Sequence, residues 1–264
     1  MKTTFKVTWI SLLSTIVTLL THMLADTKYH PSFILKTPIV DIPYLFLGVM
    51  LVVYFLLTLI FIGINHTIPA TKLKKGMVFT SLISLVWITF SLHPSKIDNL
   101  GSFVLAILIV LVPMSVYGIF LGYLSSEKSV QLSTKIPYTK ILIIMVLWLL
   151  FRYTYHFIDG DEPKIKSVGT FFWLISSGLV VGLVFSCLLV YINYPKPLKL
   201  LWLFNLAATI FIGFYLIGYS LDSLFYPIQY LKIGFDLLAV MLGVVINLVM
   251  DKVKKKMVYP SSDR

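Results

Sequence analysis

Six ionisable side chains lie within long apolar segments of the sequence or at their ends, where a charge is costly. They are His22, Arg152, His156, Asp159, Lys232 and Asp236. Arg152, His156 and Asp159 are separated by four and three residues, so they share one face of a helix. Charged groups inside a bilayer are rare and commonly mark substrate or ion paths. The sequence therefore predicts a substrate or proton pathway lined by these six residues.

Two of the six residues are predicted to form an ion pair. Arg152 and Asp236 lie at similar depths from the ends of their segments, and pairing lowers the cost of removing each charge from water. Two simpler interpretations stay open. Arg152 and Lys232 can reach the outer interface on their apolar stems, and Lys232 can neutralise Asp236 from one helical turn away.

A stripe of hydroxyl residues precedes His22 at helical spacing. Its members are Ser11, Ser14, Thr15 and Thr18. One interpretation is that this stripe lines an outward-facing polar cavity together with Arg152 and Asp236. The other is that the hydroxyl groups bond back to carbonyls of their own helix, which is common for Ser and Thr in membrane helices.

The composition explains why these residues are unusual. Of 264 residues, 58% are hydrophobic and only 12% are charged, whereas soluble domains carry about 25% charged residues. Apolar segments recur, each close to the roughly 20 residues that span a bilayer as a helix. They cover residues 7–25, 43–65, 76–92, 101–124, 138–158, 168–193, 198–220 and 228–250. The sequence thus predicts an all-α integral membrane protein with eight transmembrane helices in one membrane domain, 1–264.

The positive charges predict the orientation of this domain. With the N-terminus inside, the inner segments and termini hold 15 of the 22 Lys and Arg residues, and cations are retained on the cytoplasmic side. Both termini are therefore predicted to be cytoplasmic. The alternative is a cleaved leader ending near Ala25, which would leave seven spans, although Met23 is bulky for a cleavage site.

The net charge of +11 also bears on partners. The cations lie in short blocks between apolar segments and form no continuous basic face, which argues against nucleic acid. A Lys-rich inner face is instead predicted to attract anionic lipid headgroups, by about 1 kcal/mol for each well-placed cation. The short loops and lysine-rich composition favour a bacterial plasma membrane.

The two halves of the sequence, 1–132 and 133–264, resemble each other. Lys6 and His22 are 16 residues apart, as are Lys140 and His156. Four spans in each half would make both halves enter the membrane from the same side, giving a parallel repeat. The sequence therefore predicts two four-helix halves, a pattern found in transporters and also in membrane enzymes.

Motifs of common enzymes and metal sites are absent from the sequence. It contains no H-E-x-x-H, no G-x-S-x-G and no phosphate-binding loop, and its single cysteine, Cys187, lies in an apolar segment. No metal and no cofactor is expected, and an enzyme is not favoured. The leading hypothesis is a transporter or exporter of a small solute or ion. One alternative is an outer-leaflet lipid-modifying enzyme that uses His156 or His22 as a base beside Asp159 or Asp26. Another is a non-catalytic accessory, sensor or immunity protein.

Overall fold

The described part of the chain is built from eight long helices. The computed structural model describes residues 3–26, 43–94, 100–125, 138–158, 168–192, 194–218 and 227–258, and these contain no strand. The helices are α1 (Thr3–Asp26), α2 (Pro43–Ile64), α3 (Lys72–Ser91), α4 (Leu100–Leu124), α5 (Tyr138–Ile158), α7 (Val168–Tyr191), α8 (Lys196–Gly218) and α9 (Pro227–Val258). A 3-10 turn, η2 (Asn65–Thr67), follows α2. All eight are long and apolar enough to cross a membrane, which supports a multi-pass membrane protein.

Each predicted span corresponds to one of these helices, and the differences lie at the ends. Helix α3 begins at Lys72 rather than residue 76, and α9 continues to Val258 rather than ending at residue 250. Lysine is a good helix former although it is not apolar. Apolarity therefore locates the part of a helix that suits hydrocarbon, while the helix itself runs on through the lysine-rich ends.

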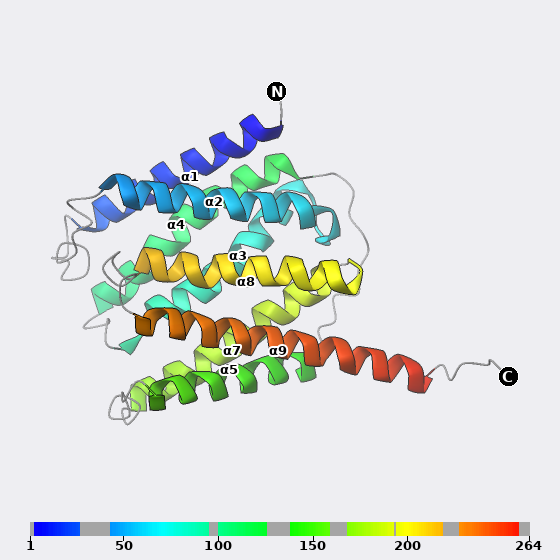
Figure 1. Ribbon diagram of the computed structural model, residues 1–264. Coiled ribbons are helices and arrows are strands. Elements are labelled where there is room, and N and C mark those ends of the chain that lie inside the picture. Colours follow the sequence, from blue (N-terminus) through cyan, green and yellow to red (C-terminus); the bar gives the residue numbers. More distant parts are fainter. Residues whose placement is uncertain are drawn as a thin grey trace.

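The helices form two groups with the same pattern of neighbours (Figure 1). In the first group α1 packs against α2 and α4, and α3 packs against α4. In the second group α5 packs against α7 and α9, and α8 packs against α9. The groups meet where α2 contacts α8 and where α3 contacts α7 and α8. The start of α1 and the end of α9 lie at the same end of the bundle, as an even number of crossings requires.

Aromatic side chains of α3 join the two groups. The indole N–H of Trp87 donates a hydrogen bond to the carbonyl of Ile210 in α8 (3.0 Å). The indole N–H of Trp173 in α7 donates to the carbonyl of Thr89 (2.7 Å). Phe90 of α3 is buried and packs against four aromatic rings of the second group, those of Trp148, Trp173, Phe211 and Phe214.

Glycines allow close approach within each group. A Cβ atom on Gly76 of α3 would overlap the carbonyl oxygen of Gly118 in α4 and lie 2.6 Å from the amide nitrogen of Gly122. In the second group, a Cβ atom on Gly243 of α9 would lie 3.1 Å from the Cα atom of Ile144 in α5. Small residues at such crossings let helix backbones pack directly against each other.

Replacing Gly76 with alanine is expected to lower the free energy of unfolding by about 3 kcal/mol, because the new methyl group meets backbone that cannot rotate away. The matched control is Gly48→Ala in α2, where a Cβ atom meets nothing within 4 Å. Thermal unfolding in detergent micelles would compare the two variants. Equal unfolding temperatures for both would contradict the close α3–α4 contact.

Candidate functional site

An ion pair lies buried between α5 and α9. The guanidinium Nη2 of Arg152 is 3.3 Å from Oδ2 of Asp236, and the two side chains are 2% and 1% exposed. This is the pair that the sequence predicts. The burial of Arg152 rules out the alternative in which its side chain extends to the outer interface.

Tyr215 of α8 links the two charges. Its hydroxyl group accepts a hydrogen bond from Arg152 Nη2 (3.0 Å) and donates one to Asp236 Oδ2 (3.2 Å). Three helices, α5, α8 and α9, therefore supply one charged cluster. Only a weak sign of Tyr215 is present in the sequence, namely its place inside an apolar segment rather than at the end of one.

Aromatic rings cover both cations near this cluster. The guanidinium carbon of Arg152 lies 5.6 Å from the ring centre of Phe90 and 5.1 Å from that of Trp148. The ammonium of Lys232 lies 5.5 Å from the ring centre of Tyr155 and 5.6 Å from that of Tyr215. Cations are attracted to such ring faces within about 6 Å. Tyr215 thus contacts Arg152 through its hydroxyl group and Lys232 through its ring.

The two predicted histidines, His156 and His22, lie in different groups of helices. His156 is buried one turn beyond Arg152, beside the ring of Tyr155. His22 lies in the other group of helices, where its Nδ1 is 2.8 Å from the carbonyl oxygen of Thr18. Asp159 lies outside the described residues, and the side chain of Asp26 is likewise not described.

The hydroxyl stripe of α1 does not join the ion pair. Ser11, Thr15 and Thr18 each donate to a carbonyl four residues earlier in their own helix, as the second interpretation of the stripe expects. Helix α1 packs against α2 and α4, on the opposite side of the bundle from α5 (Figure 1). The structure does not bring the stripe and the charged cluster together in one cavity.

A neutral hydrogen-bond network joins α1, α2 and α4 in the first group. The hydroxyl groups of Thr18 and Tyr54 are 2.7 Å apart, and those of Thr58 and Tyr117 are 2.8 Å apart. Tyr117 also donates to the carbonyl of Tyr54 (3.1 Å). The sequence did not single out these tyrosines, because an apolar segment reveals neither the neighbours nor the orientation of a phenol.

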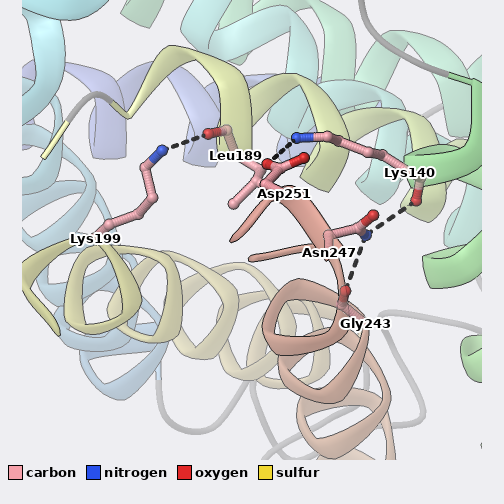
Figure 2. A network of polar contacts seen from close by, with 6 residues as sticks. All are labelled: Lys140, Leu189, Lys199, Gly243, Asn247 and Asp251. Atoms are coloured by element: carbon pink, nitrogen blue, oxygen red, sulfur yellow. Dashed lines mark hydrogen bonds and ion pairs between the residues drawn. The ribbon is translucent and has the colours of Figure 1, made fainter. Parts of the chain in front are cut away.

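A second ion pair joins α5 and α9 at the other end of the bundle (Figure 2). Lys140 Nζ is 2.6 Å from Asp251 Oδ2, with side chains 14% and 43% exposed. Asn247 donates to the carbonyls of Gly243 and Lys140 (2.9 and 3.3 Å), and Lys199 of α8 donates to the carbonyl of Leu189 (3.0 Å). Twelve residues of α5 separate the two ion pairs, which is about 18 Å along a helix.

Among the described residues, no group of three or more His, Cys, Asp or Glu side chains could hold a metal ion. No protein-family model, no curated protein and no solved structure matches this chain. The candidate function therefore rests on the charged cluster and on the eight apolar helices.

Removing the hydroxyl group of Tyr215 tests how strongly the charged cluster depends on it. Tyr215→Phe is expected to lower the free energy of unfolding by about 2–3 kcal/mol, because both lost hydrogen bonds involve charged groups. Tyr54→Phe is the matched control and should cost about 1 kcal/mol, because its partner Thr18 is neutral. Chemical unfolding of the purified variants measures both. A larger loss for Tyr54→Phe would contradict the assigned importance of the charged cluster.

Proposed function

We propose that this chain is a small multi-pass membrane transporter for a small solute or ion, with the Arg152–Tyr215–Asp236 cluster in its pathway. The observation that carries the proposal is the burial of this ion pair among apolar helices. Two charges in such a place cost free energy that apolar side chains would not. Buried ionisable residues of membrane helices typically line substrate or proton paths.

The cluster offers a chemistry suited to coupling. Asp236 can take up a proton, which would weaken its attraction for Arg152 and let the guanidinium group bind another anionic partner or shift relative to α9. Tyr215 contacts both groups and can stabilise either arrangement. A transporter needs two such states of similar free energy, each favoured by a different ligand.

The topology belongs to the same proposal: both termini cytoplasmic, in a bacterial plasma membrane, with lysine-rich helix ends near anionic headgroups. Single cysteines test it. Tyr230→Cys is expected to react with a membrane-impermeant maleimide on intact cells, and Lys252→Cys only after the cells are opened, since both side chains are exposed at opposite ends of α9. The native Cys187 is buried and gives the background. The reverse labelling pattern would invert the topology.

Transport itself is tested in inverted vesicles that maintain a pH gradient reported by a fluorescent amine. We expect one class of added solute, among inorganic cations, amino acids, organic acids and organic cations, to dissipate the gradient in a protein-dependent way. Asp236→Asn should reduce this response by at least about tenfold, because the neutral amide cannot bind and release a proton. Lys252→Gln, exposed at the far end of α9, should retain it. No response from any class, relative to vesicles without the protein, would overturn the proposal.

A non-catalytic accessory role is the second candidate, and one observation favours it. The guanidinium group of Arg152 lies near the rings of Phe90 and Trp148, which pack on each other, and this suits a fixed structural joint. In that case Asp236→Asn would alter folding or partner binding without changing any solute flux. The lipid-modifying enzyme gains no support from the described residues, since Asp159 and the side chain of Asp26, the expected partners of His156 and His22, lie outside them.

A further inference from the structure

Two cations converge on one tyrosine in the charged cluster. Arg152 Nη2 donates to the hydroxyl group of Tyr215, and the ammonium of Lys232 lies over the ring of the same residue. Lys232 is also one helical turn before Asp236 in α9. The carboxylate of Asp236 therefore lies within reach of a cation from α5 and of another from its own helix.

The contact between Arg152 and Asp236 is long for an ion pair of this type. Its 3.3 Å separation exceeds the roughly 2.7–2.9 Å of a tight hydrogen bond between a charged nitrogen and a carboxylate. A guanidinium group binds carboxylates best with two parallel hydrogen bonds in one plane. A second carboxylate that achieved this geometry would compete well for Arg152.

The surroundings select the rest of such a ligand. The rings of Phe90 and Trp148 cover the guanidinium group, and that of Tyr155 faces Lys232. The cluster is close to one end of the bundle, since Lys232 is five residues after the start of α9 and Arg152 six residues before the end of α5. Lys232 is only partly buried, so it would meet an entering ligand first.

We propose that the cluster binds the carboxylate of a small organic acid with an apolar or aromatic body. The ligand takes the guanidinium group of Arg152, and Asp236 shifts its pairing to Lys232, one turn away, where such pairs stabilise a helix. The bound cluster then has two cations and two carboxylates, with the ligand's apolar body against the rings. As a transport substrate this acid depends on the proposed function, whereas its binding does not.

Binding is tested on the full-length protein in detergent by calorimetry, with sodium benzoate as the probe. Sodium chloride at equal ionic strength, sodium phosphate and benzyltrimethylammonium chloride are the comparison salts. Benzoate is expected to bind and the other salts to bind at least about tenfold more weakly. Lys232→Gln should weaken benzoate binding by about tenfold, the loss of one charge-assisted contact, while Lys252→Gln should leave it unchanged. Arg152→Lys, which keeps the charge but not the planar fork, should weaken it as well.

Three results would overturn the assignment: no benzoate binding beyond that of chloride, equal binding by the Lys232→Gln variant, or phosphate binding as tight as benzoate. The unfolding temperatures of Lys232→Gln and Arg152→Lys show that each variant is folded before binding is compared. Flux in vesicles separates this inference from the proposed function. If benzoate does not bind but another solute is transported, the substrate class is wrong and transport stands. If benzoate binds without any flux, the site stands and transport is wrong.

Discussion

Replacing Asp236 with alanine is expected to lower the free energy of unfolding by about 3–5 kcal/mol. The reason is the charge left behind: Arg152 is 2% exposed and would remain buried without its carboxylate. Arg152→Ala should cost a similar amount by leaving Asp236 buried. Replacing both together, as Arg152→Met with Asp236→Leu, should restore most of the stability, because two apolar side chains suit this environment.

The second ion pair of the same two helices provides the matched control. Asp251 is 43% exposed, so Asp251→Ala should cost no more than about 1 kcal/mol, as for other solvent-exposed pairs. Unfolding by denaturant in micelles measures all four variants. If the double variant is as unstable as either single variant, the two charges themselves stabilise the fold. The loss in the single variants would then not come from one buried charge left without its partner.

The double variant also separates folding from function. If Arg152 and Asp236 serve only as a joint, the stable apolar pair should preserve whatever the protein does in the membrane. If they line a pathway, the double variant should fold and yet fail to dissipate a pH gradient. A stable and inactive protein is the outcome that the transporter proposal expects.

The ion pair could be predicted from the sequence because depth along a helix follows from residue number. Arg152 and Asp236 lie at comparable distances from the ends of their apolar segments, and few other charges lie so deep. Spacing also placed His156 one turn from Arg152, on the face that the structure buries. Such inferences need only the rise and period of one helix at a time.

What the sequence could not provide is which helices are neighbours. The stripe from Ser11 to Thr18 has the right spacing for a pathway, but α1 packs on α2 and α4, away from Arg152. The hydroxyl groups of Ser11, Thr15 and Thr18 bond within their own helix, and that of Thr18 also bonds Tyr54. Apolar segments all present similar surfaces, so their order around the bundle depends on details such as the contact of Gly76 with Gly118.

The two groups of four helices share a pattern of neighbours, and their common origin by duplication stays a prediction. Each half has a first helix flanked by its second and fourth, and a third helix on its fourth. The offset of 134 residues that relates His22 to His156 also relates Thr18 to Arg152. Thr18 bonds Tyr54 in a neutral network, whereas Arg152 bonds Tyr215 in a charged one. The partners also differ in position, because Tyr54 belongs to the second helix of its group and Tyr215 to the third helix of the other.

Phe90 is the residue through which the first half reaches the charged cluster. It comes from α3, is 3% exposed, and its ring packs on Trp148 at 5.9 Å and faces the guanidinium carbon of Arg152 at 5.6 Å. Phe90→Ala is expected to lower the free energy of unfolding by about 3–5 kcal/mol, because it leaves a cavity between the halves and removes one ring from a buried cation. Chemical unfolding of the purified variant in detergent micelles measures this loss.

Phe103 of α4 provides the matched control for Phe90→Ala. Phe103 of α4 is 40% exposed, so Phe103→Ala should change the stability in micelles by less than about 1 kcal/mol, with no cavity formed. Phe90→Leu keeps most of the volume but loses the aromatic face, and should recover the packing without the cation contact. If the Phe90→Leu variant regains stability but carries less solute flux than the unchanged protein, the first half influences the pathway through this ring. If flux recovers with stability, Phe90 only fills space, and the charged cluster works within the second half alone.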